Sequence, residues 1–175
     1  MRYQYVCLVC AMTFLSADAA EPPRASLQWR NEVIRTAREI WGLNAPVADF
    51  AGQLHQESGW APDALSPAGA QGMAQFMPAT AKWVSQLWKS VLAKNSCQRM
   101  AFTLSAYNGG QGWVNRDKKL AAAKGLDASI WFEHVERVNA GRSAANWREN
   151  RHYSKAILYQ HASRYLQWGQ ASCIH

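Results

Sequence analysis

The sequence predicts an all-α domain, and three observations support that fold class. Apolar residues recur at three- and four-residue steps in several segments, which is the spacing of one helix face. Glycine and proline residues separate these segments. We find no alternation of apolar and polar residues typical of a strand, no internal repeat and no low-complexity tract. A chain of 175 residues is long enough for one such domain with a sizeable core.

The first twenty residues are typical of a signal peptide. Arg2 supplies a positive charge, residues 6–15 form an apolar stretch too short to span a bilayer, and Ala17-Asp18-Ala19 is a small-residue cleavage site. We therefore expect a signal peptide over residues 1–20, a domain over residues 21–175, and a periplasmic or secreted protein. An uncleaved anchor is the alternative. We expect no stable membrane span after signal removal, because no later segment is long and apolar enough.

Helical segments are expected through the rest of the chain. The first follows Ser26, a candidate N-cap, and ends at Gly42. The second starts at Pro46, a residue tolerated in a first turn, and carries Glu57 on the face of its apolar residues. A glycine- and proline-containing loop over residues 58–72 follows. The later segments are a helix opened by Pro78, a helix over 97–107 ended by Gly109-Gly110, shorter helices over 113–124 and 128–138, and a last helix over 147–168.

Charge and residue spacing limit the classes of partner. The formal net charge is +7, from 19 Lys and Arg against 12 Asp and Glu, which favours an anionic polymer as partner. Nucleic acid is not expected, because there is no dense basic run and no nucleic-acid motif. The histidines show no metal-ligand spacing with cysteines or carboxylates, so we expect no metal. We also expect no cofactor and a monomeric protein.

Two cysteines, Cys97 and Cys173, remain after removal of the signal peptide. An even pair in an exported chain indicates a disulfide. It would close a loop of about 75 residues and contribute on the order of 4 kcal/mol in the chain-entropy account. Two free thiols are the alternative.

Three short motifs occur in a fixed order along the chain. They are Glu57-Ser58-Gly59-Trp60, Gly69-Ala70-Gln71-Gly72-Met73-Ala74-Gln75-Phe76-Met77-Pro78 and Ala106-Tyr107-Asn108-Gly109-Gly110. This order resembles the catalytic domain of the soluble lytic transglycosylases, lysozyme-like enzymes that cut peptidoglycan glycan strands and are related to goose-type lysozymes. The resemblance runs from about Phe50 to Tyr153. It implies a compact lysozyme-like helical domain with a substrate cleft.

Glu57 is the candidate catalytic residue. Cleaving a glycosidic bond needs a proton delivered to the leaving oxygen, and a carboxylic acid supplies it at neutral pH when burial raises its pKa. The place of Glu57 on an apolar helix face, with Trp60 three residues on, predicts a buried carboxylate. On spacing alone, a solvated glutamate at a helix end is the alternative. The resemblance implies that Glu57 acts first as acid and then as base.

A second carboxylate is not evident in the sequence, although hydrolysing glycosidases normally use two. Asp49 lies near a helix start, where it complements the helix dipole, and Asp63 lies in a turn, where aspartate is common. This agrees with what the resemblance implies: a hydroxyl of the substrate's own muramic acid attacks, and the product is a 1,6-anhydro sugar. A lysozyme-type hydrolase, for which Asp63 is the first partner to seek, is an alternative. A peptidoglycan-binding module without turnover is another.

The resemblance also implies which residues bind the glycan. Glycines in the second motif let the backbone approach a sugar closely. Ala74 stands where the family commonly has methionine, which changes the shape of the wall. A late tyrosine, Tyr153, is implied to reach Glu57 and to orient or polarise it. The substrate-binding residues implied are Ser66, Gly72, Met73, Gln75, Tyr107 and Asn108. The setting stays open between a secretion apparatus, a phage lysis or entry step and general wall turnover.

Overall fold

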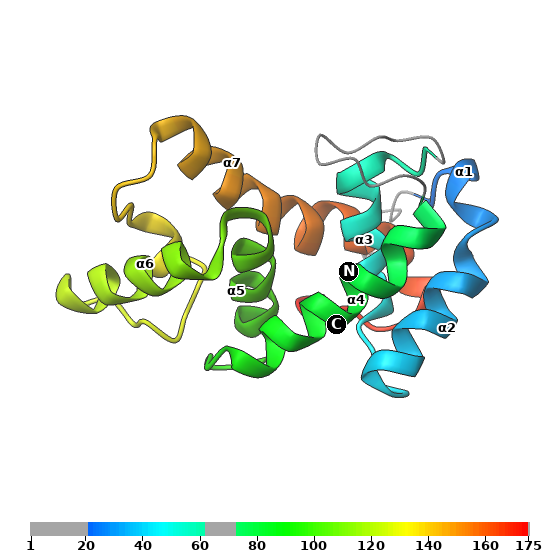
Figure 1. The fold of residues 1–175 in the computed structure, drawn as a ribbon, viewed down its shortest axis with the longest axis horizontal. Coiled ribbons are helices and arrows are strands. Elements are labelled where there is room, and N and C mark those ends of the chain that lie inside the picture. Colours follow the sequence, from blue (N-terminus) through cyan, green and yellow to red (C-terminus); the bar gives the residue numbers. More distant parts are fainter. Residues whose placement is uncertain (1–20, 62–72, 175) are drawn as a thin grey trace, which may run out of the picture.

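The computed structural model describes residues 21–61 and 73–174, and the side chains of all of these except residues 73–77. In this part of the chain every regular element is helical and no strand occurs, as the all-α prediction requires. Helices α5, α6 and α7 lie on one side of the molecule, α1 and α2 on the other, and α3 and α4 between them (Figure 1). None of the described helices is long and apolar enough to cross a membrane.

The first predicted helix is divided into α1 (Arg24–Leu27) and α2 (Arg30–Trp41). Ser26 is therefore not an N-cap. It lies inside α1, where it is buried and its hydroxyl donates to the Pro23 carbonyl at 2.7 Å. The predicted end of this first helix is confirmed, since Gly42 follows α2 with a φ of 82° that favours glycine.

Helix α3 (Val47–Ser58) follows Pro46 as predicted and is buried on all sides over residues 47–54. It packs against the C-terminal segments η2 (Ala156–His161) and η3 (Ala162–Trp168). Gly52 permits that close packing, because a Cβ there would lie 3.0 Å from the Ala162 nitrogen. Helix α3 is thus the central element of the fold.

The third helix was predicted to begin at Pro78, and this prediction is wrong. Helix α4 (Met73–Ser90) begins five residues earlier. Pro78 lies inside it, where the missing N–H leaves one carbonyl of the preceding turn without its helical partner. Helix α5 (Ser96–Gly109) begins under the Asn95 side chain, which accepts from the Gln98 N–H at 3.0 Å. It ends at the two glycines, as predicted.

Helix α6 (Gln111–Ala123) matches its prediction, but the helix predicted over 128–138 is wrong. That segment contains only the short turn η1 (Val135–Arg137). The Asp127 carboxylate accepts from the Ser129 N–H at 2.7 Å, and the Gln98 side-chain oxygen accepts from the N–H groups of Trp131 and Phe132 at 2.8 and 3.0 Å. These acceptors replace the bonds that a helix would have made.

The last predicted helix begins three residues early, as α7 (Ala144–Lys155), under a Ser143 cap that accepts from the Asn146 N–H. It continues without a break through η2, whose turns are widened, and η3, whose turns are tightened. The predicted end at Trp168 is confirmed.

The C-terminal segment is held against the rest of the fold at three points. A disulfide with an S–S distance of 2.06 Å joins Cys97 and Cys173, which confirms the predicted pair. The Ala48 N–H donates to the Gln170 carbonyl at 3.0 Å, and the Ser172 N–H donates to the Asp49 carboxylate at 3.0 Å. The start of α3 is therefore tied to the chain end.

Candidate functional site

The end of α3 presents Glu57 at the surface. Gly59 ends the helix with a φ of 58°, and Trp60 also has a left-handed φ, of 67°, which is strained for a residue with a side chain. Trp60 is fully buried, and its indole N–H donates to the Tyr165 hydroxyl at 2.6 Å. The turn that follows Glu57 is thereby anchored in the core. Glu57 itself is exposed, so the predicted burial of its carboxylate is wrong.

Two buried residues hold the carboxylate of Glu57. The Tyr153 hydroxyl donates to Oε1 of Glu57, and the Gln53 side-chain N–H donates to the Tyr153 oxygen at 3.2 Å. Burial, and then the nearby charge of Glu57, raises the pKa of Tyr153 well above its ordinary value. The hydroxyl therefore stays protonated and remains a donor. Gln53 was not identified from the sequence, although it lies one turn before Glu57.

Aromatic rings continue the site away from Glu57. The ring of Tyr107 lies parallel to that of Tyr153, with centroids 6.4 Å apart, and contacts Trp83 of α4 at 4.8 Å. Burial raises the pKa of Tyr107 to about 12, so this residue also stays neutral. Trp83 is about half exposed, and only that exposure distinguishes it from the core tryptophans.

A polar cavity lies next to Asn108, the residue after Tyr107. Its volume is about 360 Å³, and it extends the site along α5 and α7. The Asn108 side-chain N–H donates to Oε1 of Glu149 at 3.4 Å at its edge. Its lining includes Asn108, Trp113, Arg142, Ser143, Asn146 and Glu149.

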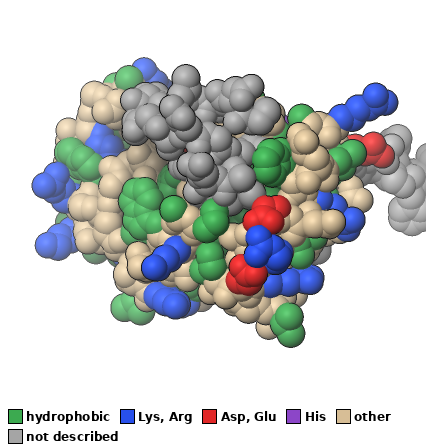
Figure 2. Space-filling view, turned by 45° about the vertical axis from the view of Figure 1, so that its right-hand side comes forward, with side chains coloured by type: hydrophobic (Ala, Val, Ile, Leu, Met, Phe, Trp, Pro, Cys, Tyr) green, Lys and Arg blue, Asp and Glu red, His purple; other side chains and the backbone are tan. Residues whose placement is uncertain are grey.

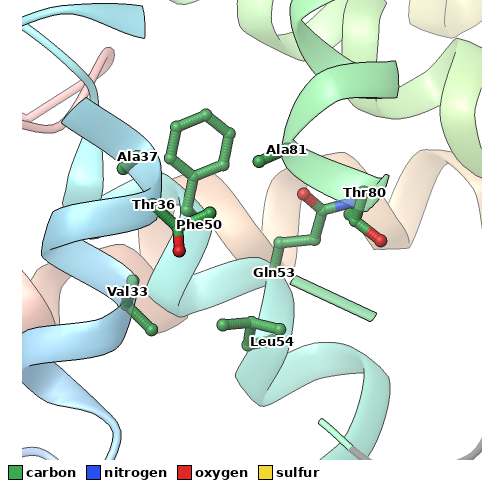
Figure 3. Close-up of a pocket in the computed structure, with 8 residues that line it drawn as sticks. All are labelled: Val33, Thr36, Ala37, Phe50, Gln53, Leu54, Thr80 and Ala81. Atoms are coloured by element: carbon green, nitrogen blue, oxygen red, sulfur yellow. The ribbon is translucent and has the colours of Figure 1, made fainter. Parts of the chain in front are cut away.

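A second, much smaller cavity lies between α2, α3 and α4 (Figure 3). Its volume is about 20 Å³, and its walls include Phe50, Gln53 and Leu54 of α3. That is room for about one water molecule and far too little for a sugar ring. It borders the side chain that holds Tyr153, but it is not a substrate site.

Asp49 is placed where it cannot assist Glu57. The two residues are eight positions apart on α3, a rise of about 12 Å along the axis. Carboxylates that act as a pair in glycosidases lie within about 9.5 Å of each other. Asp49 is buried, its carboxylate accepts from Ser172 rather than only complementing the helix dipole, and burial raises its pKa to about 7.

The remaining predicted residues are placed only in part. Met73 and Gln75 lie at the start of α4, although their side chains are not described. Ser66, Gly72 and Asp63 lie outside the described residues. Over the described ranges, no group of three or more histidines, cysteines or carboxylates is arranged to hold a metal ion.

Comparison with known proteins gives one family and several relatives. Residues 51–95 match the family model described as the transglycosylase SLT domain. The chain is 34% identical over 102 residues to the membrane-bound lytic murein transglycosylase F of Shewanella pealeana, covering 47% of this chain and 21% of that protein. It is 28% identical over 135 residues to the protein of the same name from Vibrio campbellii, covering 66% and 23%. The chain therefore spans under a quarter of the length of these relatives.

Proposed function

We propose that this chain is a peptidoglycan lytic transglycosylase, because residues 51–95 match the transglycosylase SLT domain model and the chain is similar to membrane-bound lytic murein transglycosylases. The proposed reaction cleaves the β-1,4 bond between N-acetylmuramic acid and N-acetylglucosamine and leaves 1,6-anhydro ends. One observation supports it above the others: Glu57 is held by the hydroxyl of buried Tyr153 at the end of α3, within the matched segment. Asp49, the described aspartate that is nearest to Glu57 in sequence, is too far along the helix to act with it.

The proposed mechanism uses Glu57 twice. Its protonated carboxyl gives a proton to the glycosidic oxygen as the bond from that oxygen to C1 of muramic acid breaks. The resulting carboxylate then takes the proton of the C6 hydroxyl of the same sugar, whose oxygen bonds to C1. No water is added, and Glu57 ends protonated. The attacking hydroxyl already lies in the bound sugar, so proximity replaces a protein nucleophile.

Tyr153 is proposed to keep the Glu57 carboxyl pointed at the scissile bond in both steps. Glu57 is exposed in the free protein, so we assign the exclusion of water from it to the bound glycan. The exposed ring of Trp83 and the half-buried ring of Tyr107 offer flat apolar faces beside it.

The proposed substrate is the glycan strand with its anionic stem peptides. The net charge of +7 favours such a polymer, and Lys and Arg side chains are spread widely over the face drawn in Figure 2. We assign glycan binding to Tyr107 and Asn108, together with Ser66, Gly72, Met73 and Gln75. The protein is proposed to act as a monomer in the periplasm or outside the cell, after removal of residues 1–20.

The experiment that tests this function is the substitution Glu57→Gln, which keeps the shape and removes the ionisable group. We expect the rate of wall clearing to fall roughly a thousandfold or more, with glycan binding kept. Glu133→Gln, at an exposed glutamate on the η1 side of the molecule, is the matched control and should keep the wild-type rate. A Glu57→Gln protein that clears walls at a near-normal rate would refute the proposal.

A lysozyme-type hydrolase is the second candidate, and one observation favours it. Glu149 lies on α7 one turn before Tyr153, on the face that meets Asn108, so a second carboxylate is present in the same region. A hydrolase that used it would lose its activity in Glu149→Gln as fully as in Glu57→Gln. The lytic transglycosylase should keep its reaction type and lose only affinity in Glu149→Gln. A binding module without turnover would show no activity in the wild-type protein.

A further inference from the structure

The side chain of Asn150 lies at the centre of a buried polar cluster between α5 and α7. Asn150 is only 1% exposed. Its Oδ1 accepts from Nη1 of Arg142 at 2.6 Å, from Nη1 of Arg151 at 2.8 Å and from the Ser105 hydroxyl at 2.6 Å. Its Nδ2 donates to the Ser105 carbonyl and to Oδ1 of Asn108, both at 2.9 Å. Both ends of the Asn150 amide are therefore fully engaged.

The polarity of these neighbours permits only one orientation of the Asn150 amide. A guanidinium group can only donate hydrogen bonds, and a backbone carbonyl can only accept them. The oxygen of Asn150 must therefore face Arg142 and Arg151, and its nitrogen must face the Ser105 carbonyl and Asn108. Asn108 meets a donor on its inner side, so its own oxygen turns inward. The Nδ2 group of Asn108 is left facing outward.

The outer side of Asn108 is the polar cavity. There its Nδ2 lies 3.4 Å from Oε1 of Glu149, and both residues line the cavity of about 360 Å³. A donor and an acceptor are thus presented side by side. The carbonyl of a substrate amide fits this donor, because Nδ2 of Asn108 has two N–H groups and can donate one to that carbonyl while the other faces Glu149.

The surrounding packing holds the Asn150 side chain in this place. Nη2 atoms of Arg142 and Arg151 lie 3.3 and 2.8 Å from a carboxylate oxygen of fully buried Asp117, so the two donors are themselves fixed. Gly109 lets α5 approach, since a Cβ at that position would lie only 2.7 Å from Nδ2 of Asn150.

We propose that Asn150 is a positioning residue, which sets the rotational state of the Asn108 amide so that the substrate always meets an N–H donor beside the Glu149 carboxylate. This inference rests on the proposed function. The ligand group is a secondary amide, supplied either by an acetamido group of the glycan or by a peptide bond of a stem peptide. Asn150 itself touches neither.

The substitution Asn150→Asp tests the orientation with almost no change of shape. A carboxylate still accepts from both arginines and from the Ser105 hydroxyl, and it balances the excess positive charge beside Asp117. It cannot donate to Asn108 or to the Ser105 carbonyl. We therefore expect the Asn108 amide to turn over and to present its oxygen to Glu149, where it repels the carboxylate and offers no donor to the substrate.

The measurement is binding in a Glu57→Gln background, so that it does not depend on cleavage. We expect Asn150→Asp to weaken binding roughly tenfold, the value of about one hydrogen bond, when binding is measured well below the Tm of the variant. That Tm should fall, because the Ser105 carbonyl also loses its donor. Ser105→Ala is the control: it removes one donor to Asn150 but leaves both arginines and the carbonyl, so affinity should change less than about twofold.

Two ligands distinguish the sources of the amide. Calorimetry with a peptide-free N-acetylglucosamine hexamer reports on the acetamido group, and a muropeptide carrying its stem peptide reports on the peptide bond. A tenfold loss with both assigns the acetamido group, and a loss with the muropeptide alone assigns the stem peptide. Unchanged affinity for both ligands in folded Asn150→Asp would overturn the proposal. Failure of the wild-type protein to release soluble fragments is a separate result, which bears on the proposed function.

If Asn150→Asp does not fold, nuclear magnetic resonance of the wild-type protein decides. We expect nuclear Overhauser contacts between the side-chain amide protons of Asn108 and the side chain of Glu149, together with slow solvent exchange of the Asn150 amide protons. Asn108 amide protons that are protected and that contact Asn150 instead would show the opposite orientation and overturn the proposal.

Discussion

The carboxylate of Glu57 is exposed, yet buried residues fix its direction. Tyr153 and Gln53 are 5% and 2% exposed and form a short chain of hydrogen bonds that ends on Glu57. A carboxylate held from below in this way is open to substrate on its other side. Because the direction of the carboxylate is already fixed, less conformational entropy is lost when the bound glycan and Glu57 reach the reactive geometry.

The hydroxyl of Tyr153 is therefore expected to matter for the rate. Tyr153→Phe keeps the ring and removes the donor, and a hydrogen bond to a charged group contributes about 1.5 to 3 kcal/mol. We expect the initial rate of fragment release to fall roughly 10- to 100-fold at a temperature well below the Tm. Tyr159→Phe, which removes a hydroxyl from a tyrosine 44% exposed, is the control and should not change it. A wild-type rate in Tyr153→Phe would mean that Glu57 needs no such support.

Asp49 predicts a pH dependence of stability. Burial raises its pKa to about 7, against about 3.9 in the unfolded chain. Folding therefore favours its protonated form, and the wild-type protein loses stability as the pH rises from about 4 to about 7. The side chain in Asp49→Asn cannot ionise, so the Tm of this variant should rise relative to that of the wild type over this pH range. Above about pH 7 the difference in Tm should stay constant.

The control for that experiment has the opposite sign. Hydrogen bonds from Ser129 lower the pKa of exposed Asp127, so its contribution is present above the unfolded pKa and is lost as the pH falls. Asp127→Asn should therefore lose stability relative to the wild type as the pH rises. A Tm difference for Asp49→Asn that is the same at pH 4 and at pH 8 would contradict the account of Asp49.

At the scale of elements, the two ends of α3 have different roles: the first anchors the helix and the last holds the candidate catalytic residue. Its first turn is bonded to the C-terminal segment through Asp49 and Ala48, and its last turn presents Glu57. Between them the helix is buried and rigid, with η2 and η3 against one side. Rigid support of this kind suits a residue that must act at a defined distance from its substrate.

In the segment over 128–138, a side chain from another helix supplies the hydrogen-bond acceptor that a local helix would have supplied. The Gln98 oxygen accepts two backbone N–H groups, from Trp131 and Phe132. Gln98→Ala would leave both without that acceptor, and we expect the free energy of unfolding to fall by about 1 to 3 kcal/mol. Gln86→Ala, at an exposed position of α4, should stay within about 0.5 kcal/mol of the wild type. Urea unfolding measures both, and equal stabilities for the two variants would reject the role given to Gln98.

Apolar spacing and glycine breaks predicted the fold class and the place of α3, α5, α6 and α7. They failed over 128–138 and at Pro78, because tertiary hydrogen bonds and packing decide those segments. The motifs pointed to Glu57, Tyr107 and Asn108. They did not reveal Gln53 or Asn150, whose roles depend on Tyr153 reaching α3 and on α7 lying against α5. Glu57 and Tyr153 are 96 residues apart, a distance that no local pattern spans.

At the scale of the whole molecule, the site lies where the two sides of the fold meet. Glu57 comes from α3, Trp83 from α4, Tyr107 and Asn108 from α5, and Glu149 and Tyr153 from α7. The site therefore has three parts: the exposed carboxylate of Glu57, the rings of Tyr107 and Trp83, and the polar cavity of about 360 Å³ beside Asn108. A polymer of alternating amino sugars is long enough to contact all three parts at once, whereas a small compact ligand is not.

The most direct test of the proposed reaction is the mass of the soluble fragments released from purified peptidoglycan. An internal attack by the C6 hydroxyl adds no water, whereas hydrolysis adds one. We predict muropeptides lighter by one water than lysozyme products and resistant to reduction by borohydride. Main products that carry reducible ends would contradict the lytic transglycosylase reaction and would establish the hydrolase instead.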